Sequence, residues 1–325
     1  MTLRPGFEIT IGGRKIRLGE RTLIMGVVNV TPDSFSDGGR FVDADRAIER
    51  GLELARQGAD WIDVGGESTR PGSKPVAAEE ELQRVFPVIR DLHRILPSLP
   101  ISIDTTKAEV AEKALQAGAS IINDVSGLRF DGRLGNVARR HRAPLILMHL
   151  RGRPETMQRK PFVRDIGRSL RNGLAASIRR ARLHGVSRKQ LIIDPGLGFG
   201  KSRRQNFEIL AHLSRLQEFG LPILVGTSRK SFVQAIVQGD RLDPGKRLAS
   251  TWPITAGKAR RTAEGGSNSA LEIGDATAVA ASILAGAHIV RVHDVAAVLP
   301  AVRIADAILA GGGTRPSSDA DAFRL

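Results

Sequence analysis

Residues 23–29 read LIMGVVN, a short apolar run that stops at a polar residue, and the chain repeats this pattern six more times. Each later run also ends at, or leads directly into, polar and charged side chains. Short buried strands with reactive groups only at their carboxyl ends are typical of a (β/α)8 barrel, whose active site lies on that face. The further runs are WIDVGG (61–66), ISID (101–104), IIND (121–124), LIID (191–194), ILVG (223–226) and IVRVH (289–293).

Amphipathic segments fill the gaps between these runs, as the crossover helices of parallel strands would. Between residues 43 and 57, for example, Ile48, Leu52 and Ala55 share one helical face. A Gly-Ala pair precedes three of the runs, where the glycine can close a helix. We therefore predict an α/β fold, a (β/α)8 TIM barrel, with strands at about 23–29, 61–65, 101–104, 121–124, 144–149, 191–194, 222–226 and 288–292.

The rest of the chain is assigned around this barrel. The stretch GFEITIGGRKIRL, within residues 5–20, predicts a β-hairpin that turns at Gly12-Gly13 and caps the barrel floor. Residues 1–310 are expected to form a single domain, because eight βα units need about 250 residues. Residues 240–275, rich in glycine and serine in their second half, are expected to be an inserted loop. Residues 311–325 are expected to be a flexible C-terminal tail.

Composition excludes several classes of protein. The chain has no cysteine, which excludes disulfides, thiolate metal sites and a cysteine nucleophile. It has neither an apolar run of the roughly 18 residues that a membrane span needs nor the apolar core of a signal peptide, so a cytoplasmic protein without a membrane partner is expected. The net charge of +15 is interpreted as a solvated basic surface that attracts an anionic substrate. No nucleic-acid partner is expected, because no binding motif with interleaved aromatic residues accompanies the charge.

Polar side chains at the strand ends form a candidate site, because these ends converge in a barrel. Asp104, Asn123 and Asp194 each end a strand, and together they can bracket a heterocycle that bears donors and acceptors. A lone strand-end aspartate often only caps the next helix, an interpretation that suits Asp124. Asn29 ends the first strand, where its amide oxygen suits either a hard cation such as Mg2+ or the backbone of the following loop.

Two loops add groups that suit an anion. GGESTRPG (65–72) exposes backbone amides beside Arg70, and is either an anion site or a plain surface turn. GTSRKSF (226–232) follows the seventh strand, where barrels commonly bind an anion at a helix N-terminus, and Ser228 is expected to cap that helix. Arg229 and Lys230 are adjacent, so at most one of them can point inward.

Two further motifs complete the candidate site. Arg291 and His293 lie on one side of the last strand and form a cationic fork that suits a diphosphate. DPGLGFGKS (194–202) is similar to a phosphate loop, but three residues instead of four separate Gly196 from Gly200. ATP binding is therefore rejected, and an exposed Phe199 is the informative part of this loop.

Taken together, these motifs resemble those of dihydropteroate synthases. The resemblance runs from about Leu23 to Ala307 and rests on NVTPDSFSDGG, GGESTRPG, SIDTTK, INDVSG, LMH, DPGLGFGK, GTSRKS and RVHDV. It implies a transferase of folate biosynthesis that joins 6-hydroxymethyl-7,8-dihydropterin diphosphate to p-aminobenzoate and releases diphosphate. It also implies Mg2+ as cofactor, a homodimer and a target for sulfonamides.

The resemblance implies a role for each residue that matches a family motif. The pterin is held by Asp104, Asn123, Asp194 and Lys230. The diphosphate is held by Asn29, Arg291 and His293, with Mg2+ near Asn29. A mobile loop with Ser68, Thr69, Arg70 and Pro71 closes over the site, and the p-aminobenzoate pocket is shaped by Phe199, Ser228 and Lys230. The catalytic set is Asp104, Lys230, Arg291 and His293: the cations and Mg2+ neutralise the leaving diphosphate, Asp104 stabilises the pterin cation, and the neutral arylamine attacks.

Two alternatives remain at this point. A pterin-binding methyltransferase barrel would share the aspartate and asparagine pocket, but would not need STRPG, SRK and the RxH fork together. A non-catalytic protein that binds pterin or nucleic acid would use the +15 charge, but not the complete chemistry of the strand ends. The chain departs from the family in the long 240–275 segment and in the arginine-rich 151–190 stretch.

Overall fold

A computed structural model describes residues 4–31, 40–159, 161–240, 242 and 266–312 of the chain. Its main sheet has eight parallel strands: β3 (Leu23–Asn29), β4 (Trp61–Gly65), β5 (Ile101–Asp104), β6 (Ile121–Asp124), β7 (Leu145–Met148), β8 (Leu191–Asp194), β9 (Leu224–Gly226) and β10 (Ile289–Val292). They are ordered β8-β7-β6-β5-β4-β3-β10-β9, and a parallel bridge between Ile193 and Ile223 joins the two ends of this order. The predicted TIM barrel is therefore confirmed, with strand bounds within two residues of those expected.

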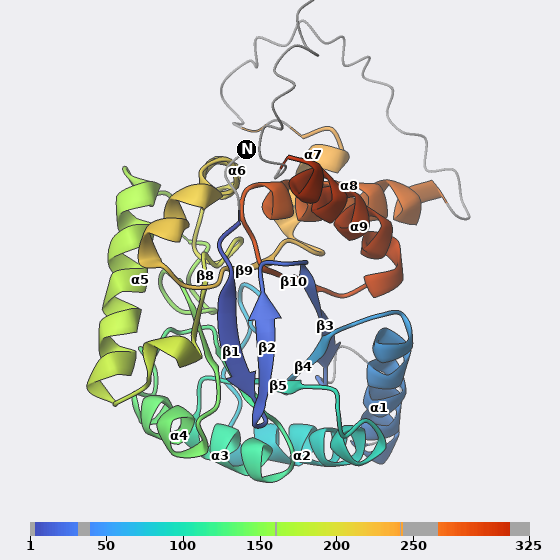
Figure 1. Cartoon of the computed structure of the whole chain (residues 1–325), viewed down its shortest axis with the longest axis vertical. Helices are drawn as coiled ribbons and strands as arrows, with labels where there is room; N and C mark the ends of the chain where they lie inside the picture. The colour runs from blue at the N-terminus through green and yellow to red at the C-terminus, as the bar shows by residue number, and fades with distance from the viewer. Residues whose placement is uncertain (1–3, 32–39, 160, 241, 243–265, 313–325) are drawn as a thin grey trace, which may run out of the picture.

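Helices surround the barrel and connect consecutive strands (Figure 1). They are α1 (Arg40–Arg56), α2 (Ala78–Ile95), α3 (Ala108–Gln116), α4 (Arg133–His141), α5 (Ile166–Leu183), α6 (Arg203–Ala211), α7 (Ser231–Val237), α8 (Gly266–Leu284) and α9 (Val295–Gly311), with short 3-10 turns η2 (Arg188–Gln190) and η3 (Leu213–Phe219). The three Gly-Ala pairs close α1, α3 and α8 as predicted. In each pair the glycine has a positive φ, and the alanine N–H donates to a carbonyl five residues earlier, at 2.9 to 3.0 Å.

The barrel has an outer and an inner core. Alternate strand residues such as Ile62, Ile103 and Val290 face outward and pack against the helices. The other residues face the barrel axis, where the lower part is apolar and contains Met25, Trp61, Ile121, Ile146, Ile192, Leu224 and Ile289. Because the lower interior is filled with side chains, polar groups are confined to the upper part, at the carboxyl ends of the strands.

The predicted N-terminal hairpin covers the lower interior. Strands β1 (Phe7–Ile11) and β2 (Arg14–Leu18) are antiparallel, and Gly12 and Gly13 both have positive φ, as a tight hairpin turn requires. Ile9, Ile11 and Leu18 are buried and join the inner apolar cluster. In Figure 1 the hairpin lies across the front of the barrel.

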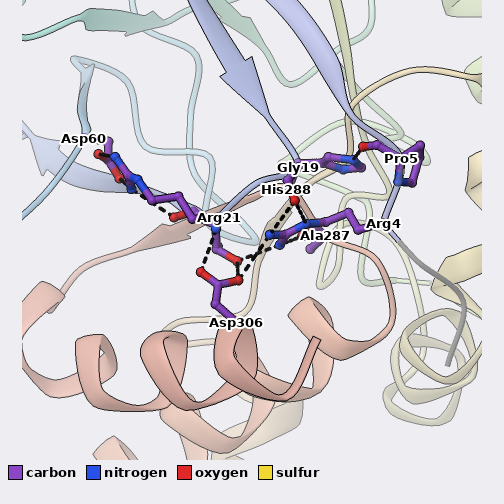
Figure 2. Close-up of polar contacts among 9 residues, drawn as sticks. Arg4, Pro5, Gly19, Arg21, Asp60, Ala287, His288 and Asp306 are labelled. Atoms are coloured by element: carbon purple, nitrogen blue, oxygen red, sulfur yellow. Dashed lines mark hydrogen bonds and ion pairs between the residues drawn. The ribbon is translucent and has the colours of Figure 1, made fainter. Parts of the chain in front are cut away.

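A network of polar contacts holds the start of the chain against its last helix. The side chain of Arg4 donates to Asp306 Oδ1 at 3.2 Å and to the carbonyl of Ala287 at 2.9 Å. Asp306 on α9 also accepts from the backbone N–H and the hydroxyl of Thr22, both at 2.7 Å. His288 Nε2 lies 3.0 Å from the carbonyl oxygen of Pro5 (Figure 2). The first residues of the described chain are therefore fixed to the end of the barrel sequence.

One boundary of the sequence interpretation was wrong. Residues 240–275 were expected to be a loop, but α8 begins at Gly266, so the last ten residues of this segment are helical. The stretch ALEIGDATAVAA continues without a proline or a further glycine pair, which allows the helix to extend toward its N-terminus. Residues 241 and 243–265 lie outside the described residues, as do residues 313–325 of the expected tail 311–325, whereas Gly311 is the last residue of α9.

Candidate active site

Five charged or amide side chains meet in the upper barrel interior. Asp63, Asp104, Asn123, Asp194 and Arg291 come from five different strands, and the four acidic and amide side chains are buried. Strand register explains part of this meeting, because Asp104 is the partner of Asn123 in the β5–β6 pair and both face the axis. The structure therefore brings together the three strand-end residues that the sequence singled out. Asp124 instead accepts from the N–H groups of Ser126 and Leu128, at 2.8 and 2.6 Å, as a loop-capping residue does.

Arg291 links these residues. Its Nε donates to Asp63 Oδ2 at 2.6 Å, and its Nη2 donates to Asp104 Oδ2 at 2.9 Å. Burial raises the pKa of the Asp104 carboxyl, and the negative charge of Asp63 adds to this effect while Arg291 opposes it. Burial disfavours the charged form of Arg291, yet Asp63 and Asp104 hold its pKa above the ordinary value. The guanidinium thus forms part of a buried charged cluster.

Asp63 is one of the site residues that the sequence interpretation missed. It lies in the middle of β4, is fully buried, and its Oδ2 also accepts from Asn123 Nδ2 at 3.1 Å. Its Oδ1 is buried and has no hydrogen-bond partner among the described residues. A carboxylate inside the apolar run WIDVG was the available signal, because a charge is rarely buried unless it is paired.

Lys230 forms the opposite wall. Its Nζ lies 4.1 Å from the centroid of the Phe199 ring, a cation–π arrangement. Burial lowers the pKa of Lys230, and the nearby Arg291 adds to this, whereas burial raises the pKa of Asp194. Arg229 is exposed and also lines the cleft, so the expectation that at most one of the two adjacent cations points inward stays a prediction.

The loop after β8 is held by a second buried lysine that the sequence interpretation did not assign. Lys201 Nζ donates to the carbonyl oxygens of His149, Gly196 and Phe199, at 2.9, 2.7 and 3.0 Å. A Cβ on Gly196 would lie 2.2 Å from the His149 carbonyl, so only glycine fits there. The side chain of Lys201 therefore holds this loop through protein carbonyls.

The loop after β9 differs from expectation in one respect. Ser228 does not cap α7, which begins at Ser231 with Lys230 at the N-cap position. Its hydroxyl instead donates to Asp275 Oδ2 at 3.1 Å, and lies 3.3 Å from His293 Nδ1. The expected carboxylate position at a helix N-terminus capped by Ser228 is therefore corrected, because the chain turns once more before the helix starts.

Arg291 and His293 line one cleft, but the fork that they form is cationic only in part. Two carboxylates balance the charge of Arg291. Burial, together with the nearby Arg291, Arg229 and Lys230, lowers the pKa of His293 to about 3, so its ring is neutral at pH 7. A bound anion would oppose these effects, since it would favour the protonated ring.

The cleft has a volume of about 390 Å³ and contains residues from seven strand ends or strand-to-helix connections. It is lined, among others, by Asn29, Thr69, Arg70, Pro71, Phe199, Ser228, Lys230, Arg291 and His293. A deeper and much narrower space of about 20 Å³ adjoins it and is lined by Asp104, Asn123, Asp194, Phe199, Lys230 and Arg291, with other residues. The predicted site residues thus divide between an open cleft and a deep polar pocket.

The loop that carries Ser68, Thr69, Arg70 and Pro71 is attached at both ends. Glu67 accepts a hydrogen bond from Lys107, which also contacts the buried carboxylate of Glu81. The N–H of Gly72 donates to the carbonyl of Pro154 at 3.1 Å. Between these attachments Arg70 and Pro71 are exposed at the rim of the cleft, and Ser68 and Thr69 are half-buried.

Comparison with known proteins identifies the family. Residues 25–293 match the family described as pterin binding enzyme. The dihydropteroate synthase of Synechocystis sp. is 43% identical over 300 residues, which is 92% of this chain and 94% of that protein. The chain belongs to the dihydropteroate synthase family. It is accordingly a transferase of that type, and this decides against the methyltransferase alternative.

Solved structures of the family agree with this assignment. Xanthomonas albilineans dihydropteroate synthase in complex with 7,8-dihydropteroate has a TM-score of 0.75 at 36% identity, with 93% of this chain and 99% of that chain covered. Yersinia pestis dihydropteroate synthase with a sulfonamide drug has a TM-score of 0.78 at 36% identity, with 94% and 100% covered. Within the ranges that the structure describes, no helix is both long and apolar enough to cross a membrane.

Proposed function

We propose that this protein condenses 6-hydroxymethyl-7,8-dihydropterin diphosphate with p-aminobenzoate and releases diphosphate, as a dihydropteroate synthase of the folate pathway. The observation that carries this proposal is the arrangement of two adjoining spaces. The deep pocket offers carboxylate and amide groups, while the open cleft offers cations. A ligand with a polar heterocycle at one end and a diphosphate at the other is complementary to both spaces.

The pterin ring occupies the deep pocket in this proposal. The carboxylates of Asp104 and Asp194 supply acceptors for the ring edge. The amide of Asn123 supplies both an acceptor and donors, and Lys230 supplies a donor from the side. The free space of about 20 Å³ is too small for a bicyclic ring. The side chains that line this space therefore have to shift when the pterin enters.

The diphosphate lies in the cleft near Asn29, Arg291 and His293. Because His293 is neutral before binding, the negative charge of the diphosphate draws a proton onto its ring and adds a donor. Departure of the diphosphate leaves positive charge on the pterin methylene group. Asp104, which accepts from Arg291 Nη2 at 2.9 Å, would stabilise that charge without becoming covalently attached.

The residues present fit a magnesium ion that arrives with the substrate. No three His, Asp or Glu side chains of the described ranges are grouped to hold a metal. Asn29 offers one amide oxygen at the cleft, and Mg2+ typically completes its octahedron with waters and substrate phosphates. When bound there, Mg2+ would supply further neutralisation of the leaving group.

The p-aminobenzoate lies between Phe199, Lys230 and the turn at Ser228, under the loop with Thr69, Arg70 and Pro71. Its amine is neutral near pH 7, so it attacks without a strong base and mainly needs orientation. Sulfonamides, which the Yersinia pestis enzyme binds, would compete for the same position.

The proposal extends to assembly and location. A homodimer would bury apolar side chains on the last two helices, where Ile273, Ile304 and Ile308 are 67%, 62% and 43% exposed. A cytoplasmic protein would have access to both soluble substrates.

Diphosphate release from purified protein tests the proposed reaction. The pterin diphosphate and Mg2+ are supplied with and without p-aminobenzoate, and both diphosphate and dihydropteroate are measured. We expect release to depend on p-aminobenzoate and to match dihydropteroate in amount. Tight pterin binding without product in the complete mixture would refute the proposal.

A further inference from the structure

Asp275 contacts the candidate site from outside the strand ends. It lies on α8, and its Oδ2 accepts from the backbone N–H of Arg229 at 2.9 Å and from the hydroxyl of Ser228 at 3.1 Å. It is half-buried, and burial raises its pKa, whereas the contacts with Arg229 and Ser228 oppose that rise. One carboxylate oxygen thus holds two consecutive residues of the loop after β9.

The loop has a conformation that needs such support. The N–H of Lys230 bonds to the carbonyl of Thr227 at 3.3 Å, which closes a tight turn. Within it Arg229 has φ +57°, in the left-handed region that residues with a side chain usually avoid. This conformation is energetically unfavourable for a residue with a side chain. The hydrogen bond from the Arg229 N–H to Asp275 favours the turn and so fixes the direction in which Lys230 leaves it.

The Ser228 hydroxyl transmits the effect of Asp275 to His293. A serine hydroxyl has one proton to donate. Because that proton goes to the Asp275 carboxylate, Ser228 Oγ can only accept from its other neighbours. These neighbours are the backbone N–H of His293 at 3.4 Å and His293 Nδ1 at 3.3 Å. For Nδ1 to make this contact it has to carry the ring proton.

We propose that Asp275 is a positioning residue, which fixes the turn at Ser228 and Arg229 and, through the Ser228 hydroxyl, holds His293 in the tautomer with its proton on Nδ1. The opposite ring nitrogen, Nε2, then carries the lone pair, and the His293 side chain lines the cleft. This arrangement rests on the proposed function in one respect only, which is the use of Nε2. In the proposed reaction, Nε2 takes up a proton and then donates a hydrogen bond to a diphosphate oxygen.

The tautomer can be observed without any substrate. Long-range proton–nitrogen correlation spectra of uniformly 15N-labelled protein at pH 7.5 distinguish a protonated from an unprotonated ring nitrogen. The chain has seven histidines, and the spectrum of His293→Asn identifies the signals of His293 by their loss. We expect a protonated Nδ1 and an unprotonated Nε2 in the wild type. A wild-type spectrum with the proton on Nε2 would overturn the proposal.

Two substitutions then separate positioning from simple structural support. Asp275→Ala removes the acceptor and should move the His293 proton to Nε2 or give a mixture of tautomers. Asp275→Asn keeps an oxygen acceptor of the same size and should restore the wild-type tautomer. Glu272→Ala changes an exposed carboxylate on the same helix and serves as the matched control. A folded Asp275→Ala protein with an unchanged Nδ1–H signal would overturn the assignment.

Steady-state kinetics give a second test of the role of Asp275. We expect Asp275→Ala to lower kcat/KM for the pterin diphosphate at least fivefold, with Asp275→Asn within about twofold of the wild type and Glu272→Ala unchanged. Equal activity of Asp275→Ala and wild type would overturn the kinetic part of the inference. If the wild type forms no dihydropteroate but shows the expected tautomers, the proposed function fails and the structural role of Asp275 stands.

Discussion

Replacing Lys201 with methionine tests how much the hydrogen bonds of this buried lysine contribute to the stability of the protein. Methionine has a similar length but no donor, so the substitution removes three hydrogen bonds without a large change in volume. The Gly196 carbonyl keeps its contact with the Phe199 N–H at 3.1 Å. The carbonyls of His149 and Phe199 lose the donor that Lys201 provides at 2.9 and 3.0 Å.

The expected loss of stability follows from these two carbonyls. A buried carbonyl left without a partner costs about 1 to 3 kcal/mol. The Phe199 carbonyl is only partly buried and can bond to water, so it contributes at the low end of that range. We expect Lys201→Met to lower the free energy of unfolding at pH 7 by about 2 to 4 kcal/mol.

The pH dependence distinguishes this explanation from general loss of packing. Burial lowers the pKa of Lys201 from 10.5 to about 7, with Lys230 and Arg151 adding to the effect and Asp194 opposing it. Between these two values the unfolded chain binds more protons at this residue than the folded chain, so wild-type stability rises with pH. Between pH 7 and 9.5 the gain from Lys201 amounts to about 3 kcal/mol, and it is lost as the pH falls to 7. Methionine has no such gain.

Urea unfolding followed by circular dichroism at pH 7, 8 and 9.5 measures the difference between wild type and Lys201→Met. We expect this difference to widen with pH by about 3 kcal/mol. Lys189→Met, at an exposed position of η2, should show neither the loss nor the widening. A difference that stays constant over this pH range would refute the reasoning about the lowered pKa of Lys201.

Three further predictions concern the pocket and the cleft. Lys230→Ala and Asp194→Ala should each lower kcat/KM at least tenfold, equivalent to about 1.4 kcal/mol, in steady-state assays of product formation; near-normal kinetics in both would reject their assignment to the pterin. Gly196→Ala should lower the melting temperature far more than Gly239→Ala, because both have positive φ but only the first would place a Cβ against a carbonyl, at 2.2 Å; equal shifts would count against the steric argument. Diphosphate binding near pH 6 should take up a proton on His293, since its pKa of about 3 leaves the ring neutral beforehand; calorimetry in two buffers of different ionisation enthalpy measures this, and His293→Asn should reduce the uptake.

The barrel could be predicted from the sequence because its strands are short, apolar and parallel. A parallel strand covered on both faces is a continuous apolar run, and LIMGVVN and LILM show this pattern directly. The strand ends could be predicted for the same reason, since the first polar residue after each run marks the open face of the barrel. Asp104, Asn123 and Asp194 are found there.

The residues that escaped prediction act through tertiary contacts. Asp63 lies within a strand, and its sequence neighbours do not indicate that it meets Arg291, 228 residues away. Lys201 follows a glycine-rich loop, where a lysine is more often expected to contact a phosphate than three carbonyls. Asp275 was assigned to an inserted loop, because the glycine and serine content before it obscured the start of α8. The decisive partners of Asp63 and Asp275 lie far away in the sequence, as does one of the three carbonyls that Lys201 contacts.

The contacts between the beginning and the end of the chain have a consequence for synthesis on the ribosome. Arg4 and Thr22 bond to Asp306, so the hairpin that fills the barrel floor is secured by a helix translated about 300 residues later. At about 5 to 20 residues per second, the N-terminal segment waits tens of seconds for this partner, with Ile9, Ile11 and Leu18 lacking their final cover. The hairpin therefore gains its complete set of contacts only after the last helix has been made.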